Sequence, residues 1–156
     1  FEKYKQQAAG IDIELLLGSE VFCSGLFLKE ISEKKFLTIN NTEYLLVEFY
    51  FDDDIDRVLF ALDVIVDAGY IPIVAHPERY HFLRENTSAI KQIVSKGGLL
   101  QINKTSLFEK NGFETYEFAM WLLSKEYASF VASDAHDMQY RTTDMQRSFV
   151  KIYSKI

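Results

Sequence analysis

Short apolar runs alternate along the chain with longer segments in which apolar residues recur at helical spacing. The short runs predict strands at residues 15–22 (interrupted by Gly18), 36–39, 44–51, 71–75, 99–103 and 130–133. The helical spacing predicts helices at about residues 55–68, 88–96, 116–125 and 143–153, and a helix-like stretch covers residues 1–9. From residue 44 onward, the predicted order repeats as strand, helix, strand.

The predicted helix at residues 55–68 has recognisable signals at both ends. The acidic run Asp52, Asp53 and Asp54 precedes it, and acidic residues are favoured as N-caps and in the first turn. Gly69 follows the helix, where a glycine commonly ends it. We therefore interpret the acidic run as the start of a helix rather than as a catalytic D-x-D motif.

The alternation of strands and helices predicts an α/β fold. Parallel neighbouring strands need a crossover connection, and a helix provides it along a right-handed path. An open doubly wound sheet and a closed (β/α) barrel both fit this order, and polar residues at successive strand ends favour the barrel only weakly. Because about five strands alternate with helices, fewer than a closed barrel uses, we expect an open sheet or an incomplete barrel. The 156 residues are expected to form one domain, residues 1–156.

Composition and charge exclude several classes of protein. Hydrophobic residues make up 48% of the chain, with 7 Gly and 2 Pro, which is typical of a folded domain. The 23 acidic residues outnumber the 17 basic ones and no basic cluster is present, so neither nucleic acid nor an anionic membrane surface is an expected partner. No apolar run approaches the roughly 20 residues that cross a bilayer. The one cysteine, Cys23, is expected to be a small buried residue in a cytoplasmic protein.

Acidic and imidazole side chains follow the predicted strands at the same end. Glu20 and Glu48 end two apolar runs, His76 follows a third, and Asp134 and His136 follow the last. The last two lie two positions apart, so an extended chain directs both to one side. Burying an unpaired carboxylate is costly, and no Lys or Arg in the same strands neutralises it. A divalent metal ion is the simplest cation, and this mixed nitrogen and oxygen set suits Mn, Fe or Zn.

Taken one at a time, the candidate residues have simpler interpretations. A lone Glu20 is more often solvated, a lone Asp134 more often caps a helix, and His81 is not expected to be a ligand. Arg79 and Arg141 follow the strand-end histidines, and each alone is more often part of a surface ion pair. Beside a metal cluster, however, two guanidinium groups indicate a phosphoester substrate.

Motifs of other enzyme classes are absent from the sequence. No G-x-S-x-G, G-x-x-x-x-G-K-S/T or G-x-G-x-x-G string is present. No Arg follows Cys23 at the spacing of a cysteine-based phosphate loop. Nucleophilic catalysis by a side chain of this protein is therefore not expected.

Three strings of the sequence resemble a known family. HPERY at residues 76–80, LLQINKTSLF at residues 99–108 and VASDAH at residues 131–136, followed by Arg141, resemble the bacterial protein-tyrosine phosphatases of the PHP superfamily encoded in capsule and exopolysaccharide operons. The resemblance extends from about Leu15 to the C-terminus. It implies a distorted (β/α) barrel of PHP type with a cluster of divalent ions, usually manganese, and a phosphotyrosine substrate on the cytoplasmic tyrosine kinase that controls polysaccharide export.

The resemblance implies metal-binding roles for five residues. Glu20 would bridge two metal ions, while Glu48 and His76 would complete one site. Asp134 would bind the other ion of that pair, and His136 would belong to a further site. These ions would activate a hydroxide that attacks phosphorus in line and would neutralise charge as the tyrosine oxygen leaves.

The catalytic residues that the resemblance implies are Arg79, Arg141 and His136, with the two arginines holding the phosphate. One part of the family pattern is absent. Members of the family begin with an H-x-H strand upstream of the position that matches Phe1, and the three histidines of this chain form no such motif. We therefore expect a PHP domain without its N-terminal strands, either a fragment or a short relative, which binds fewer ions and turns over poorly alone.

Two other functions fit the same residues. One is a PHP phosphoesterase that acts on small phosphomonoesters such as sugar or histidinol phosphate. The other is a catalytically inactive module that binds a kinase tail or assembles with other subunits, and the 13 Phe and 9 Tyr would then supply a homo-oligomer interface. Core packing explains most of these aromatics.

Overall fold

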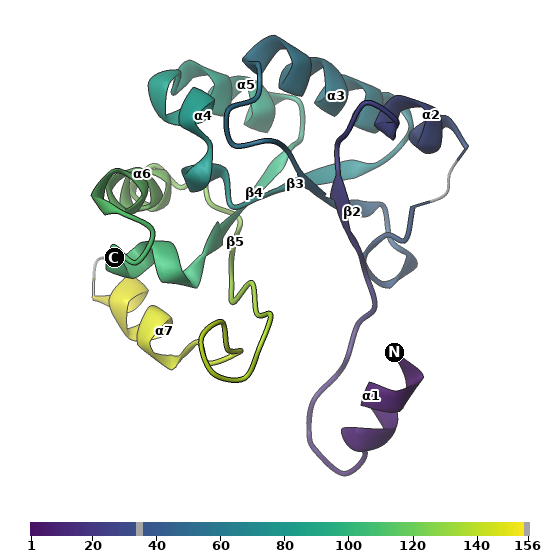
Figure 1. Cartoon of the computed structure of the whole chain (residues 1–156), viewed down its shortest axis with the longest axis vertical. Helices are drawn as coiled ribbons and strands as arrows, with labels where there is room; N and C mark the ends of the chain where they lie inside the picture. The colour runs from purple at the N-terminus through teal and green to yellow at the C-terminus, as the bar shows by residue number, and fades with distance from the viewer. Residues whose placement is uncertain (34–35, 155–156) are drawn as a thin grey trace.

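A five-stranded parallel sheet forms the centre of the computed structural model, which describes residues 1–33 and 36–154 (Figure 1). Its strands are β1 (Glu20–Phe22), β2 (Tyr44–Glu48), β3 (Ile71–Ala75), β4 (Leu99–Asn103) and β5 (Phe130–Ala132). Each strand lies beside the next one in sequence, and every pair is parallel. The predicted α/β class is confirmed.

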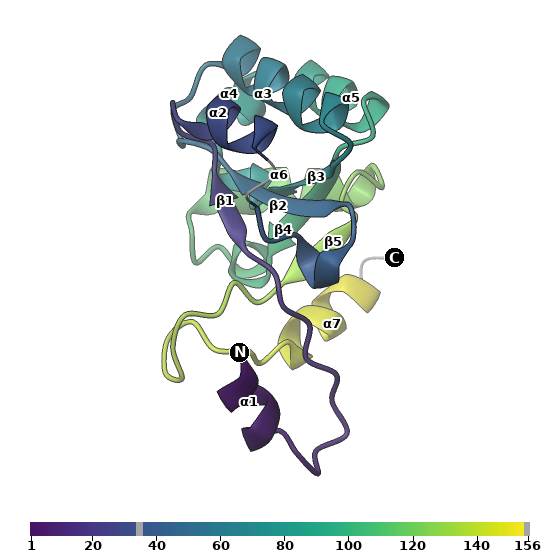
Figure 2. The same cartoon turned by 90° about the vertical axis from the view of Figure 1, so that its right-hand side faces the viewer.

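Helices connect the strands, and several of them cover one face of the sheet (Figure 2). The helices that follow the first strand are α2 (Phe27–Ser32), α3 (Ile55–Asp67), α4 (His81–Glu85), α5 (Ser88–Ser95), α6 (Phe113–Ser124) and α7 (Gln146–Tyr153). Consecutive pairing of parallel strands is the order found in (β/α) barrels rather than in doubly wound sheets. Within the described ranges the sheet is open, with β1 and β5 at its edges, so an incomplete barrel stays a prediction.

Alternation along the strands separates the core from the candidate site. Val21, Leu45 and Val47 are buried, whereas Glu20 and Glu48 lie on the opposite face and are partly exposed. Successive side chains of a strand point to opposite faces, so the apolar positions of β1 and β2 leave the two carboxylates on the same side. The core then holds the strands, and thereby the carboxylates, in place.

The start of α3 follows the sequence prediction. The Asp54 side chain caps the helix by accepting hydrogen bonds from the backbone N–H groups of Asp56 (2.9 Å) and Arg57 (3.1 Å). Arg57 also pairs with Asp53 and donates to the Cys23 carbonyl oxygen (3.2 Å), which ties the helix to the segment after β1. Cys23 is buried as expected, and burial raises the pKa of its thiol to about 12. The thiol is therefore neutral at ordinary pH.

Four predicted strands differ from the structure. The strand predicted at residues 44–51 ends earlier, at Glu48, and the one predicted at residues 130–133 ends at Ala132. Residues 36–39 do not form a strand: they lead into a 3-10 helix, η1 (Ile39–Asn41). The Leu37 carbonyl accepts hydrogen bonds from the backbone N–H and the hydroxyl of Ser19. The strand predicted at residues 15–22 is reduced to β1. Gly18 explains part of this, because a Cβ atom there would lie 3.2 Å from the Ile39 Cα atom, so the close crossing of the two segments favours glycine.

Helix ends and short helices account for the remaining differences. The helix predicted from residue 116 begins at Phe113, and the last helix begins at Gln146 rather than at residue 143. Helices α2 and α4 were not predicted. The helix-like stretch at the start of the chain is α1 (Glu2–Gln7), which buries no residue and stands away from the sheet in Figures 1 and 2. None of the described helices has the length and apolar character needed to span a bilayer.

Candidate metal centre

Three side chains converge where β1, β2 and β3 lie side by side. The ligand atoms of Glu20, Glu48 and His76 all lie within 4.8 Å of one another. His76 Nε2 is 3.2 Å from Glu48 Oε1 and 3.6 Å from Glu20 Oε1. Two ligands bound to one ion at about 2.1 Å are themselves separated by about 3.0–3.4 Å, so the observed distances are close to those of a metal site.

The sheet register explains why the two carboxylates meet. Glu20 pairs with Leu46, two positions before Glu48, so both glutamates lie on one face of adjacent strands. Glu20 begins β1 rather than ending it, which differs from the sequence prediction. Glu20 is therefore offset from Glu48 by two positions along the sheet. The two carboxylates still meet, because glutamate side chains are long enough to span this offset.

His76 reaches the same point through an unusual backbone conformation. It follows β3 with φ 35° and ψ 53°, in the left-handed region that a non-glycine residue rarely adopts. Such a residue costs about 1–3 kcal/mol and persists where surrounding contacts over-determine it. The imidazole packs against Phe51 and Tyr80, with ring centroids 6.0 and 5.6 Å away, and is almost fully buried. A strained, buried histidine beside two carboxylates indicates a functional site.

The donor set fits a divalent ion. Two carboxylates that are about one-third exposed face one imidazole that is 4% exposed. A protonated imidazole would neutralise one of the two negative charges, whereas a divalent cation neutralises both. Nε2 of His76 faces the carboxylates, and its Nδ1 is buried without a hydrogen-bond partner among the described residues. Nε2 is therefore the nitrogen available to a metal, and the nitrogen and oxygen donors suit Mn, Fe or Zn.

A second polar group lies in the loop after β5, outside this cluster. Asp134 accepts a hydrogen bond from the Asn103 side chain (2.7 Å) and forms an ion pair with the Arg141 guanidinium. The His136 ring lies 3.5 Å from the Asp134 carboxylate and is 57% exposed. Asp134, like His76, has a left-handed backbone, with φ 47°. The predicted ligands thus fall into two groups, one gathered by the sheet and one by a loop.

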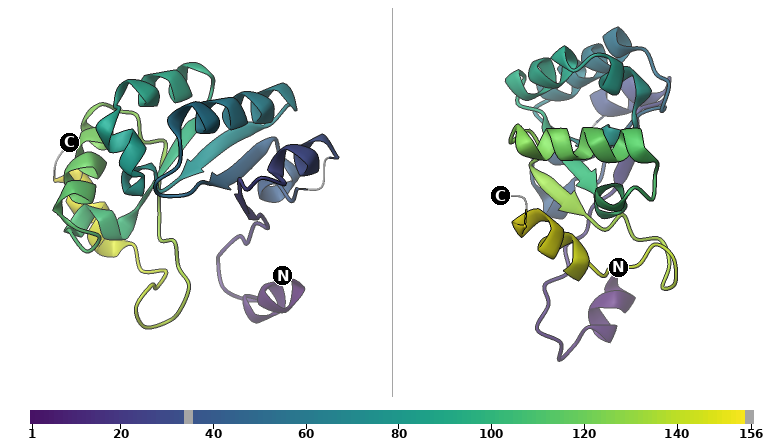
Figure 3. Two further views of the ribbon diagram at one scale, coloured as in Figure 1. Left: turned by 45° about the horizontal axis from the view of Figure 1, so that its top comes forward. Right: turned by 90° about the vertical axis from the view of Figure 1, so that its left-hand side faces the viewer.

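A buried lysine anchors this loop. The Lys104 ammonium group donates to the carbonyl oxygens of Asp144 (2.7 Å) and Thr142 and approaches the Thr142 hydroxyl at 3.5 Å. Its neighbour Asn103 holds Asp134 at the other end of the loop. The loop that carries Arg141 extends from the sheet (Figure 3) and is held at both ends by residues of one string, LLQINKTSLF.

The two candidate arginines differ in their partners. The Arg79 guanidinium lies 4.5 Å from the centroid of the Phe51 ring, and among the described residues no carboxylate pairs with it. Arg141 pairs with Asp134 through Nη2 alone, which leaves its other N–H groups available. Arg79 therefore has a guanidinium free for an anion, oriented by a cation–π contact.

Sequence reasoning missed residues that support the site from behind. Glu78 is fully buried and accepts hydrogen bonds from the Asn103 backbone (3.0 Å) and the Ser106 hydroxyl (2.7 Å). Burial raises the pKa of its carboxyl, although these hydrogen bonds work in the other direction. The buried Tyr80 hydroxyl accepts from the Phe49 backbone N–H (3.0 Å). The string HPERY thus supplies a candidate ligand and two buried contacts, and no local pattern marks Glu78 as buried.

The chain matches the family described as capsular polysaccharide synthesis, CpsB/CapC, over residues 2–156. It belongs to this family. The resemblance drawn from HPERY, LLQINKTSLF and VASDAH is thereby confirmed. These strings include His76, Asn103 and Asp134, each of which lies at the end of one of three neighbouring strands or within two residues of it.

Similar proteins of the CpsB/CapC family are named tyrosine phosphatases. The chain is 35% identical to tyrosine-protein phosphatase YwqE of Bacillus subtilis, covering 88% of this chain and 54% of that protein. It is 31% identical to tyrosine-protein phosphatase CpsB of Streptococcus agalactiae, covering 83% of this chain and 55% of that protein. The chain thus spans little more than half the length of these relatives.

A solved structure supports the same relationship. The fold superimposes with a TM-score of 0.84 and 31% identity on a chain from the crystal structures of YwqE from Bacillus subtilis and CpsB from Streptococcus pneumoniae. The match covers 98% of this chain and 63% of that one. Those two proteins are described as unique metal-dependent tyrosine phosphatases.

Proposed function

We propose that this chain is the metal-binding part of a tyrosine-protein phosphatase that acts on a tyrosine kinase of capsule or exopolysaccharide synthesis. The convergence of Glu20, Glu48 and His76 within 4.8 Å carries this proposal, because it provides a divalent cation site without any Cys ligand. The named activity of the YwqE and CpsB relatives supports the choice of phosphotyrosine. The free Cys23 thiol is consistent with the cytoplasm, where the proposed kinase substrate is exposed.

Different residues of the chain would bind different ions. Glu20, Glu48 and His76 would hold one ion, preferably manganese, with iron or zinc as alternatives; Asp134 would contribute to a second ion and His136 to a further one. When bound, such ions lower the pKa of coordinated water and offset the charge of a phosphate group. The nitrogen and oxygen donors of this chain match that role better than they match a thiolate-bound metal.

The arginines orient the phosphate. Arg79 is held over the Phe51 ring and offers a planar set of donors to two phosphate oxygens. Arg141 retains donors beyond the one that binds Asp134, so it can bind a further oxygen without leaving its carboxylate. Both groups would hold the transferred phosphoryl group in line with the departing tyrosyl oxygen.

The test combines metal analysis with substrate comparison. The chain is stripped with EDTA, reloaded with Mn²⁺, Fe²⁺ or Zn²⁺, and assayed for phosphate release from a phosphotyrosine peptide and from a sugar phosphate. We expect release that is slow for this chain alone, that depends on manganese, that is faster from the peptide than from the sugar phosphate, and that is absent from the His76→Ala variant. His81→Ala is the matched control for metal content, because His81 lies outside the metal cluster.

Other outcomes of this test identify the alternatives. Faster release from the sugar phosphate would indicate a phosphoesterase of small molecules. Phosphopeptide binding that survives EDTA, with no phosphate released under any metal, would indicate an inactive binding module and contradict the proposed activity.

A further inference from the structure

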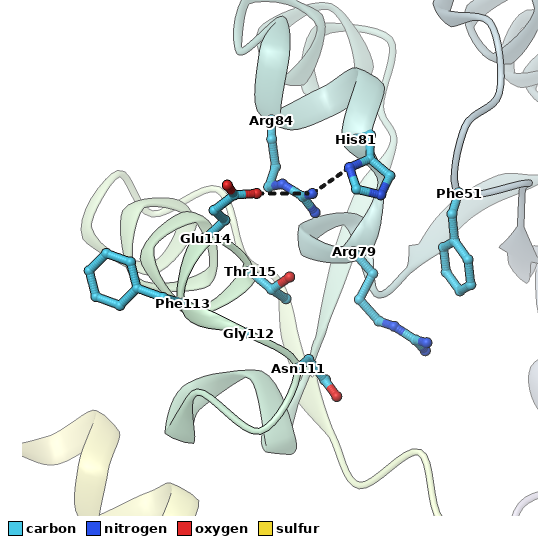
Figure 4. Close-up of a pocket in the computed structure, with 9 residues that line it drawn as sticks. All are labelled: Phe51, Arg79, His81, Arg84, Asn111, Gly112, Phe113, Glu114 and Thr115. Carbon is cyan, nitrogen blue, oxygen red and sulfur yellow. Dashed lines mark hydrogen bonds and ion pairs between the residues drawn. The ribbon is translucent and has the colours of Figure 1, made fainter.

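A groove runs from Arg79 along helix α6, beside the metal centre. Its first part is a cavity of about 660 Å³ lined by residues that include Phe51, Arg79 and Glu114 (Figure 4). A second hollow of about 620 Å³ shares Glu114 and continues to Trp121. We call the two together the α4–α6 groove. Each part has the size of a ligand-binding site, about 300–1,000 Å³.

The groove begins next to the candidate metal ligand His76. Phe51 lines it, and the same ring lies 6.0 Å from the ring of the candidate ligand His76. Arg79, which we assign to the phosphate, also lines the groove. Its guanidinium group lies 4.5 Å from the centroid of the Phe51 ring. A phosphate bound between the metal centre and Arg79 would therefore leave the rest of its molecule at the mouth of the groove.

The walls of the groove suit a polypeptide. Phe51 and Phe113 line it with 40% and 58% of their surfaces exposed. Exposed aromatic rings are enriched where proteins bind other polypeptides. Arg84 is held in the wall by the Glu78 carbonyl (3.2 Å), His81 Nδ1 (2.6 Å) and the Glu114 carboxylate (3.6 Å), as Figure 4 shows for the last two. Arg84 therefore has a fixed position in the wall before any ligand binds.

Charge changes sign along the groove. Arg79 gives the end near the metal centre a positive charge, whereas Glu85, Glu114 and Glu117 line the end near Trp121. Glu114 is paired with Arg84. In the part of the chain that the structure describes, no Lys or Arg pairs with Glu85 or Glu117, and both residues are exposed. The far end thus carries negative charge that a basic ligand group would neutralise.

We propose that the α4–α6 groove binds the segment of the substrate polypeptide next to the phosphotyrosine, with a Lys or Arg side chain of that segment opposite Glu85 and Glu117. This rests on the proposed function, because the phosphotyrosine sets the position of the segment. It makes the enzyme selective for a phosphotyrosine with a basic residue nearby. Small phosphomonoesters would not reach the groove.

Trp121 provides a direct measurement, since it is the one tryptophan of the chain and lies at the far end of the groove. The metal-loaded chain is titrated with phosphotyrosine peptides that carry one Lys at successive positions on either side, and with the matching Ala peptides. We expect one Lys position to bind about tenfold tighter than Ala, a difference of about 1.4 kcal/mol, with a change in Trp121 fluorescence. Free phosphotyrosine should leave the fluorescence unchanged.

Charge-neutralising variants assign the preference to the groove. The double variant Glu85→Gln with Glu117→Gln should bind Lys and Ala peptides equally. Glu43→Gln is the matched control, because Glu43 is exposed and adjoins the start of β2, away from the groove. It should retain the preference. Added salt should weaken the Lys peptide more than the Ala peptide.

The results separate this inference from the proposed function. Equal binding of Lys and Ala peptides by the unaltered chain, or a preference that survives in the double variant, would overturn the groove assignment even if phosphate is released. A Lys preference lost in the double variant, without release of phosphate under any metal, would support the groove and count against the phosphatase activity.

Discussion

The two groups of candidate ligands are built in different ways. Glu20, Glu48 and His76 come from three adjacent strands, and the register of the sheet fixes how far apart they lie. Asp134 and His136 come from the loop after an edge strand. His76 is almost fully buried, whereas the His136 ring is 57% exposed. The sheet thus preorganises the first group. In the second group, the positions of the side chains depend on hydrogen bonds and ion pairs made within and around the loop.

In the second group, the negative charge of Asp134 is already neutralised by a neighbouring cation. Asp134 is bound by Arg141 and Asn103, so its carboxylate has a cation and a hydrogen-bond donor without any metal. In the first group, two carboxylates share one imidazole and no Lys or Arg contacts them among the described residues. Since uncompensated charge favours cation binding, we expect the first group to bind an ion more tightly than the second.

The largest effect is expected from His76→Ala, which removes the buried ligand. Mn²⁺ at 100 times its Kd should stabilise the unaltered chain by about 2.7 kcal/mol. For a chain of this size, that corresponds to a rise of about 5–10 °C in Tm. The variant should show no rise and no bound manganese by elemental analysis. An unchanged manganese shift in His76→Ala, with His81→Ala behaving like the unaltered chain, would show that the first group is not the metal site.

A smaller effect on metal binding is expected from Asp134→Asn and His136→Ala. Both should leave the manganese affinity of the first group within about threefold, because neither residue belongs to that cluster. Phosphate release should nevertheless fall by roughly 100-fold, a loss of about 2.7 kcal/mol of transition-state stabilisation. Calorimetric titration and phosphate release measure the two effects separately. Loss of the first ion in either variant would show that the two groups act as one site.

Lys104→Met tests whether the loop must be anchored for the second group to work. The substitution leaves two backbone carbonyls without their buried donor, so we expect a loss of about 1–3 kcal/mol in stability. Because Arg141 would lose its fixed position, KM should rise about tenfold with a smaller change in kcat. Lys125→Met, at the exposed end of α6, is the matched control. Equal losses in kcat and manganese affinity would instead indicate a general structural role.

The same contrast explains how far the sequence alone predicts the molecule. Strands β3 and β4 agree with prediction to the residue, since continuous apolar runs in a buried parallel sheet leave little choice of boundary. The apolar run at residues 36–39 resembles a strand locally, but no strand of the described residues pairs with it. Because the whole fold decides which strands pair, the local sequence could not reveal this. In the site, strand-end positions identified Glu48 and His76, whereas the Asp134–Arg141 pair depends on loop geometry that no periodicity encodes.

The smallest effect is expected from Asp53→Asn, which removes the ion pair with Arg57 at the start of α3. Partial burial opposes ionisation of Asp53, but hydrogen bonds from Arg57 and from backbone N–H groups outweigh it and lower the pKa of the carboxyl. A lowered folded-state pKa contributes stability that is present above the ordinary carboxyl pKa of about 3.9 and lost as the pH falls through the folded value. Because Arg57 is 39% exposed and solvent screens the pair, the loss at pH 7 should be below about 1 kcal/mol and should vanish in acid.

Thermal unfolding of Asp53→Asn and the unaltered chain at pH 7 and pH 3 measures this difference, with EDTA present to remove metal effects. Manganese affinity should be unchanged, since the core under β1 and β2 rather than this partly buried pair holds Glu20 and Glu48 in register. If the substitution weakened manganese binding as strongly as His76→Ala does, the preorganisation of the first group would depend on the Arg57 contact to the Cys23 carbonyl, and the sheet alone would not account for it.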